Sequence, residues 1–340
     1  MDRGGAGHGA AQRHLAVRAP GRGRRPGRLP RRREGRVGRR HQAAPLLRPD
    51  HGRRRPVPPD RAAAPRLAGV HGGAGLQLLG NSDQCGFCGI GLSLAAGTTI
   101  AKKTPEMLAE VAVAAKELDG AVDATLTTGS SVAPDRGALY VARCGQAVKE
   151  AAGLPVEVQF EPPRDLAVLD RVHDMGVDAV GIHVESFDPA VLARVAPGKF
   201  RTGIETYFRT WERAVALFGE GRVSTYVILG MGEDPGLTVE MCRRAVDIGV
   251  YPFVVPLRPV AGSLMADVPA PSREYTEPIY RKVAQFLAER GLGADTAVAG
   301  CARCQACSSL NLVQQATTQQ VTTPCGTGAA PLLQIGRRPA

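Results

Sequence analysis

Two groups of closely spaced cysteines are the residues of this chain best suited to chemistry. Cys85 and Cys88 are separated by a glycine and an aromatic residue, and the sequence GIG follows them directly. Cys301, Cys304 and Cys307 form a second group much later in the chain. In a cytoplasmic chain, thiols at such spacing favour metal ligation over disulfide bonds. Zinc sites and redox-active dithiols also use a CxxC pair, so the spacing alone leaves these alternatives open.

A second set of candidate residues stands where predicted β-strands end. Strands are predicted for the apolar stretches at 124–128, 179–185, 223–229 and 253–257. The residues at their carboxyl ends are glycines or have hydroxyl, acidic or apolar side chains, as is typical of ligand sites. The candidates are Thr128, Gly129, Glu185, Ile228, Gly230, Glu233 and Leu257. His183 lies two residues before Glu185, and we predict that it packs against a neighbouring helix.

Helices are predicted between these strands. Thr104 before Pro105 is a helix N-cap, and apolar residues then recur at helical spacing up to Asp119. The aromatic stripe across 204–218 follows the same period, which predicts core packing and no cofactor stack. Strands that alternate with helices predict an α/β fold built on a parallel sheet, which is either an open doubly wound sheet or a (β/α) barrel. Glycine, serine and glutamate at the strand ends favour the barrel. Ligand sites of such barrels gather at the carboxyl ends of the strands.

Three of these motifs together resemble the radical S-adenosylmethionine (SAM) superfamily. The sequence CGFCGIG at 85–91 is similar to the second half of its CxxxCxxC loop, and ILGMGE at 228–233 resembles the end of its GxIxGxxE motif. HVESFDP at 183–189, followed by PGK at 197–199, is similar to the fourth-strand end of biotin-synthase-like members. The resemblance covers residues 81 to about 316. It is strongest toward a poorly characterised branch whose genes lie beside a nitrilase gene.

The resemblance implies a TIM-barrel-like enzyme, with a partial (β/α) barrel of parallel strands, that uses a 4Fe–4S cluster and SAM. Such an enzyme reductively cleaves SAM to a 5′-deoxyadenosyl radical, which acts on a small-molecule substrate. It implies a cytoplasmic setting, an electron donor such as flavodoxin or ferredoxin, and no membrane partner. Cys85 and Cys88 would bind the cluster. The residues implied to bind SAM are Phe87, Thr128, Gly129, Glu185, Ile228, Gly230, Glu233 and Leu257.

The chain departs from the family pattern at two positions. Asn81 stands where the first cluster cysteine is expected, and Tyr226 stands where the GxIxGxxE motif has its first glycine. An amide cannot replace a thiolate on iron, so we expect the enzyme as written to be impaired. Cys301, Cys304 and Cys307 do not have the spacing of the SAM cluster. They would bind a second Fe–S cluster or zinc, with Cys325 as a further ligand, or belong to a thiol-rich tail.

The first 80 residues differ from the rest in composition. They hold 19 arginines, four acidic residues and no lysine, serine or threonine, so their net charge is +15, and that of the remainder is −4. We interpret residues 1–80 as a disordered segment that arose from a reading-frame or start-site artefact. A genuine basic arm is the alternative. Residues 81–300 would form the barrel, and 301–340 a Cys-rich extension with a flexible tail.

Two other functions stay open. A non-catalytic zinc-binding module would use the second cysteine group. An Arg-rich nucleic-acid-binding protein would use residues 1–80, although all of the positive excess lies in that segment, so the sequence argues against it. No run of about 18 apolar residues is present, so no membrane-spanning helix is predicted.

Overall fold

The core of the protein is one parallel sheet. The computed structural model describes residues 67–68, 83–129 and 131–322. Six strands pair in sequence order, each parallel to the next. They are β1 (Leu67–Ala68), β2 (Ala124–Thr127), β3 (Val156–Gln159), β4 (Ala179–Gly181), β5 (Val223–Leu229) and β6 (Val250–Pro256). Because β1 and β6 are the two edges of this described sheet, it forms an open, partial barrel, as predicted.

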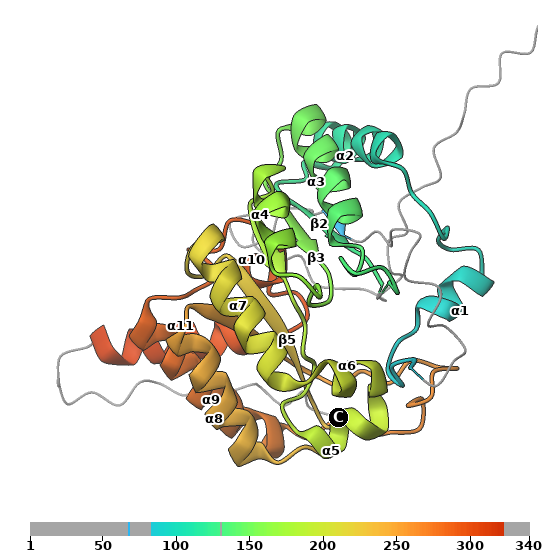
Figure 1. Cartoon of the computed structure of the whole chain (residues 1–340). Helices are drawn as coiled ribbons and strands as arrows, with labels where there is room; N and C mark the ends of the chain where they lie inside the picture. The colour runs from blue at the N-terminus through green and yellow to red at the C-terminus, as the bar shows by residue number, and fades with distance from the viewer. Residues whose placement is uncertain (1–66, 69–82, 130, 323–340) are drawn as a thin grey trace, which may run out of the picture. The chain divides into compact units, whose positions relative to one another are not determined.

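Helices connect the strands and cover the sheet. Figure 1 shows α2, α3 and α4 grouped beside β2 and β3, and α7 beside β5. Helices α8 and α9 pack against β6. The helices are α1 (Ile90–Ala95), α2 (Pro105–Asp119), α3 (Ala138–Ala152), α4 (Ala167–Asp174), α5 (Pro189–Val195), α6 (Pro197–Thr202), α7 (Ile204–Phe218), α8 (Pro235–Asp247), α9 (Arg273–Arg290), α10 (Gly300–Cys304) and α11 (Leu310–Thr322). None of the described helices is both long and apolar enough to cross a membrane.

Several helices begin at a residue whose side chain caps them. The Thr104 hydroxyl accepts a hydrogen bond from Met107 N at 3.3 Å at the start of α2, which the sequence predicted. Asp188, Asp234 and Ser272 accept equivalent bonds at the starts of α5, α8 and α9. Each cap pairs backbone N–H groups that have no partner within the helix.

The aromatic stripe of α7 packs in the core, as predicted. Tyr207, Phe208 and Trp211 are each at most 1% exposed. The Trp211 indole donates to Ile182 O at 2.9 Å, so its one polar atom is paired. This face fixes α7 against the sheet beside the end of β4.

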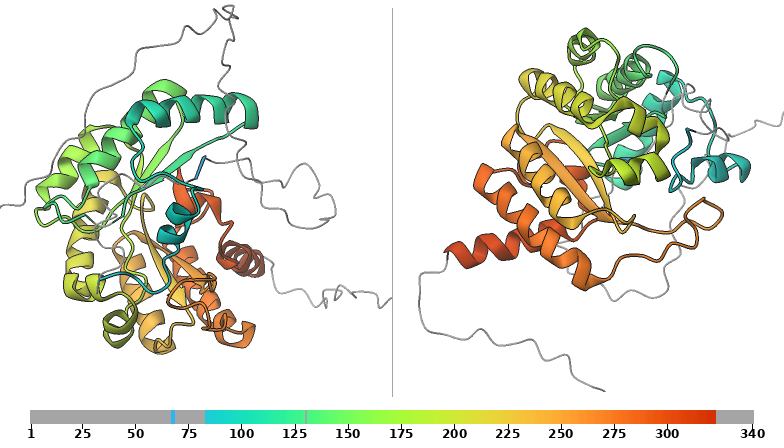
Figure 2. Two further views of the ribbon diagram at one scale, coloured as in Figure 1. Left: turned by 90° about the vertical axis from the view of Figure 1, so that its right-hand side faces the viewer. Right: turned by 60° about the horizontal axis from the view of Figure 1, so that its bottom comes forward.

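The two faces of the sheet carry different side chains. On one face, Val156 and Val158 pack against Gly145 of α3 so closely that a Cβ there would lie 2.9 Å from Val158 Cγ1. Glu157, between them in sequence, points to the opposite face, where Gly300 of α10 approaches its carboxyl group. The C-terminal segment therefore covers the inner face of the barrel. Figure 2 shows its helices, in red, in two further views.

The structure differs from the sequence-based expectations in three places. Leu67 and Ala68, within the segment expected to be disordered, pair with Ala124 and Thr125 of β2, while residues 1–66 and 69–82 lie outside the described residues. The sequence predicts a helix from Arg136 to Ala152, but α3 begins at Ala138, because the backbone at Arg136 and Gly137 is left-handed. Helix α11 continues to Thr322, beyond the point where a flexible tail was expected.

Candidate functional site

A cavity of about 360 Å³ opens at the carboxyl ends of β2, β3 and β4. The loop at 83–90 and helix α6 complete its wall. Six of the predicted site residues line it, namely Cys85, Phe87, Cys88, Thr128, Gly129 and Glu185. The structure therefore brings together motifs from three distant parts of the sequence.

The cysteine loop is a tight turn held against the barrel. Cys88 N donates to Cys85 O at 3.1 Å, and Gly86 N donates to Val195 O at 2.7 Å. A Cβ at position 86 would lie 3.2 Å from Met265 Cγ, so glycine allows the loop to approach its neighbour. Burial raises the pKa of the Cys85 thiol to about 12, which keeps the thiol protonated without a metal. Asn81 lies outside the described residues.

One buried ammonium group lies between two carboxylates in the cavity wall. Lys199 Nζ is 2.5 Å from Glu161 Oε1 and 3.6 Å from Glu185 Oε1, and it also donates to His183 O at 2.5 Å. Tyr207 donates to the other Glu161 oxygen at 2.6 Å. Burial acts to lower the pKa of Lys199, but the two carboxylates and Tyr207 outweigh it and hold the pKa well above its usual value. Lys199 therefore stays charged.

Glu185 has an unusual backbone for its residue type. Its φ is +69°, a left-handed value that favours glycine. Its N–H donates to Tyr226 O at 3.0 Å and its C=O accepts from Ile228 N at 2.8 Å, so pairing with β5 holds this conformation. Burial raises the pKa of its carboxyl group, although Lys199 opposes the effect. Backbone strain of this kind concentrates at functional sites.

His183 borders the cavity and packs on a strand, where packing on a helix was predicted. Its Nδ1 accepts from Tyr226 N at 3.2 Å, and the two rings meet edge to face with centroids 4.8 Å apart. Burial lowers the pKa of His183 to about 3, so the imidazole is neutral at physiological pH. The acceptor role of Nδ1 places the ring proton on Nε2.

The predicted residues at the ends of β5 and β6 do not line this cavity. The Glu233 carboxylate instead accepts from Gly230 N and Met231 N, each at 2.8 Å, and from Tyr275 OH at 2.7 Å. It therefore fixes the turn that follows β5. Leu257 is buried and donates its N–H to Leu229 O at 2.8 Å. Ile228 does not line the cavity, but its N–H donates to the carbonyl of Glu185, which does.

The second cysteine group lies on the inner face of the barrel, outside the cavity lining. Cys301 Sγ accepts from Tyr226 OH at 3.1 Å and lies 3.7 Å from Gln159 Nε2. Gln159 itself lines the cavity, so Cys301 lies one side chain away from it. Cys304 and Cys307 are half-buried nearby in sequence, and Cys325 lies outside the described residues. Within the described ranges, no group of three His, Cys, Asp or Glu side chains is arranged to hold a metal ion.

Further polar residues of the cavity were not predicted from the sequence. Arg136, Gln159, Glu161 and Lys199 are among them. Glu161 follows strand β3, and Lys199 belongs to the PGK sequence that carried part of the resemblance, so position offered a signal for both. Arg136 and Gln159 had no comparable signal.

Comparison with known proteins agrees with this geometry. Residues 81–245 match the Radical SAM superfamily. The bacteriochlorophyllide c C-7(1)-hydroxylase of Chlorobaculum limnaeum is 28% identical over 135 residues, which are 39% of this chain and 33% of that protein. The chain therefore matches only about a third of this curated relative.

Among solved structures, methylornithine synthase gives a TM-score of 0.47 at 18% identity, covering 62% of this chain and 59% of that one. A radical SAM methyltransferase from Sphaerobacter thermophilus gives 0.46 at 18% identity, covering 61% and 60%. The family match over residues 81–245 contains the Cys85 loop, the Thr128 turn and Glu185, which meet in one cavity. Residues 81–245 of the chain therefore form a radical SAM domain.

Proposed function

We propose that this chain binds SAM in the 360 Å³ cavity and acts there, as a radical SAM enzyme, on a small molecule. The observation that carries the proposal is the meeting of the Cys85–Cys88 loop with Thr128, Gly129 and Glu185 around that cavity. When bound, the cluster and SAM of this family supply a 5′-deoxyadenosyl radical. The residues of the chain position the reactants and exclude water.

The polar wall is suited to a ligand with hydroxyl and amine groups. The Glu185 carboxylate can accept hydrogen bonds from a ribose or an amine, and Lys199 holds it in place from the side. Thr128 is buried at the cavity edge, where its backbone and that of Gly129 can contact the amino end of SAM. Glycine at 129 permits such an approach because it has no side chain.

The protein donors for the cluster are incomplete. Cys85 and Cys88 supply two thiols to the cavity, while a cluster with an open iron needs three. Asn81 stands where the remaining cysteine, the first of the motif, is expected. Among the described residues, no His, Cys, Asp or Glu side chain joins Cys85 and Cys88 in a group that could hold a metal ion. The cavity thus suits SAM better than the loop suits its cluster, and we infer that the chain as written holds iron weakly.

For the second cysteine group we propose an auxiliary Fe–S cluster or a zinc ion. The support is the location of Cys301, whose sulfur lies on the inner face of the barrel and accepts from Tyr226 OH. Binding would require Cys304 and Cys307 to move toward it, because the described side chains are not arranged around one point. Metal analysis of Cys304→Ser against wild type tests this, and equal metal content would contradict it.

Restoring the missing thiol tests the main proposal. We expect Asn81→Cys, reconstituted anaerobically with iron and sulfide, to bind about four iron atoms per chain with broad absorbance near 400 nm. With dithionite as the reductant in the assay, this variant should release 5′-deoxyadenosine faster than wild type. The proposed electron donor of the enzyme itself is a protein such as flavodoxin or ferredoxin. Asn81→Ser is the matched control, because serine has the same shape without the sulfur. Wild type that forms a stable cluster and cleaves SAM as fast as Asn81→Cys would contradict the proposal.

A further inference from the structure

The three cations that line the cavity differ in how they are paired. Lys199 lies between Glu161 and Glu185, and Arg201 forms an ion pair with Asp83. Arg136 donates from Nη1 to the Ser131 carbonyl at 3.1 Å, and its guanidinium forms no ion pair within the described part of the chain. A guanidinium has five N–H donors, so most of those of Arg136 are available to a ligand.

The backbone at Arg136 is strained as well. Its φ is +55°, which is left-handed, and Gly137 follows at +87°. A Cβ at position 137 would lie 3.2 Å from Thr128 Oγ1, so this loop packs directly on the candidate SAM-binding turn. Glycine or asparagine would adopt the Arg136 conformation at lower cost. Strain of this kind persists where the surroundings hold it in place.

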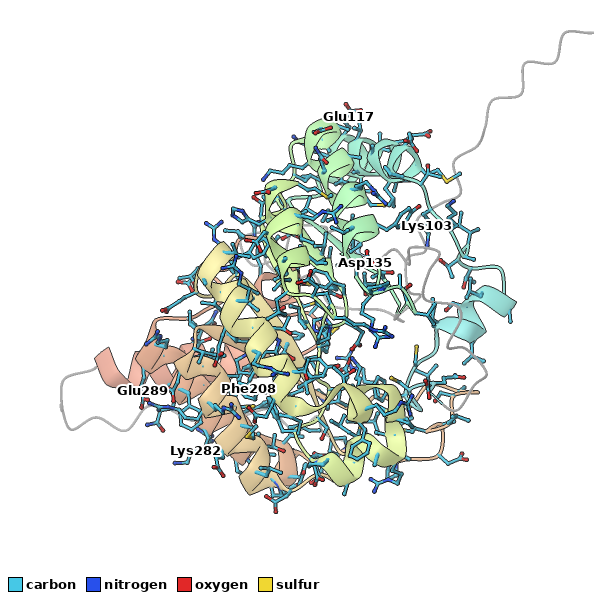
Figure 3. The ribbon with its side chains drawn as sticks, viewed as in Figure 1. Lys103, Glu117, Asp135, Phe208, Lys282 and Glu289 are labelled. Atoms are coloured by element: carbon cyan, nitrogen blue, oxygen red, sulfur yellow. The ribbon has the colours of Figure 1, made fainter. Side chains whose placement is uncertain are left out.

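Hydrogen bonds on both sides hold the strained residue. Arg136 N donates to Ala133 O at 2.9 Å, and Ala133 N donates to the Ser131 hydroxyl at 3.1 Å. Asp135, labelled in Figure 3, accepts from Leu139 N at 3.3 Å and so anchors the start of α3. The guanidinium is therefore presented from a fixed loop at the cavity wall.

We propose that Arg136 binds an oxyanionic group, a carboxylate or a phosphate, of a small molecule held in this cavity. A planar guanidinium recognises such groups through paired hydrogen bonds, which are stronger than bonds between neutral groups. Glu185 at the end of β4 would hold a hydroxyl or amine of the same or a neighbouring molecule. The inference rests on the proposed function, since SAM and its substrate are the two sources of such an anion.

Arg136→Gly is the informative variant, because it removes the guanidinium and also suits the left-handed backbone. Arg136→Lys keeps the charge but not the planar pair of donors. Arg143→Gln, at an exposed position of α3, the helix that follows Arg136, is the matched control. Calorimetric titration would use four probes: SAM, 5′-deoxyadenosine, acetate and inorganic phosphate, with the two anions added to protein saturated with SAM. Thermal unfolding of each variant shows whether it is folded.

We expect Arg136→Gly to lose at least about tenfold in affinity for one oxyanion, which corresponds to a charge-assisted hydrogen bond. Weaker SAM binding with unchanged 5′-deoxyadenosine binding would assign the anion to SAM. Unchanged SAM binding with loss of acetate or phosphate binding would assign it to the substrate. Arg136→Lys should recover part of the affinity, and Arg143→Gln should match wild type.

Equal affinity of wild type and Arg136→Gly for all four probes would overturn the proposal. So would an unfolding temperature that falls in Arg136→Gly without any change in anion affinity, because Arg136 would then act in folding alone. A wild type that does not bind SAM would refute the proposed function instead. In that case the two anions are titrated into the chain without SAM, and equal affinities again overturn the role of Arg136.

Discussion

The stability of this protein should fall as the pH rises through the neutral range, because of one buried carboxyl group. Glu157 is 1% exposed, and burial raises its pKa to about 7. It accepts from Gln159 Nε2 at 2.7 Å and from the Ser224 hydroxyl at 3.2 Å, which opposes the effect of burial only in part. Near pH 7 the folded protein therefore holds a proton on Glu157 that the unfolded chain has already released.

The sign and size follow from this difference. A folded pKa above the unfolded value of 4.5 means that folding binds a proton between these two values, so stability declines as pH rises through them. A shift from 4.5 to about 7, at about 1.4 kcal/mol per unit, gives a total near 3.4 kcal/mol. Between about pH 5 and about pH 8, the loss amounts to about 2.5 kcal/mol.

Urea unfolding of iron-free wild type and Glu157→Gln measures this contribution. The amide has nearly the same shape, can still accept from Gln159 and can donate to Ser224, but does not titrate. We expect the variant to gain about 2.5 kcal/mol relative to wild type between about pH 5 and about pH 8. Comparing the two proteins cancels the titration of all other groups. A difference between them that stays the same at both pH values would refute the reasoning.

Three further changes have distinct expected results. Gly145→Ala should lower the free energy of unfolding by about 1–2 kcal/mol, because the new Cβ would lie 2.9 Å from Val158 Cγ1. Urea unfolding measures this, and a gain in stability would mean that α3 can shift away from the sheet. Lys199→Met should lower the free energy of unfolding by about 3 kcal/mol or more, because it leaves Glu161 and Glu185 buried without their cation, and this loss should grow as the pH rises. A loss below about 1 kcal/mol in urea unfolding would show that the two carboxylates are well solvated. In folded, iron-free protein, Cys85 should react with iodoacetamide up to about a thousandfold more slowly than in protein unfolded by urea, because burial raises its pKa to about 12. Mass spectrometry measures the two rates, and equal rates would contradict the burial of the thiol.

Local patterns were enough to predict most of the fold. The Thr104 cap, the apolar spacing of α2 and the aromatic period of α7 depend on neighbours in sequence, and each prediction was confirmed. The parallel sheet followed from the alternation of strands and helices. Where a backbone departs from its usual range, sequence gave no warning, as at Arg136 before α3.

The site was predicted only in part because its contacts are spatial. Cys85, Thr128 and Glu185 share a cavity since parallel strands end on one face. Glu233 follows strand β5, but its carboxylate accepts hydrogen bonds from Gly230 N and Met231 N in the turn between them. The pairing of Lys199 with Glu161 joins two elements that are far apart in the chain, and no local pattern records it.

The inner-face contacts of the C-terminal segment have a consequence for synthesis on the ribosome. Asp123 lies just before β2 and Glu157 lies in β3, and both are buried. Arg303 forms an ion pair with Asp123, and the Cys301 backbone N–H donates to Glu157. Both partners are translated long after the two acidic residues. Until those residues leave the exit tunnel, a nascent barrel would have to keep two carboxyl groups hydrated or protonated. These long-range contacts also slow folding, because distant segments must meet before the contacts stabilise anything. The barrel should thus close only once α10 has been made, which is after all the described strands of the sheet.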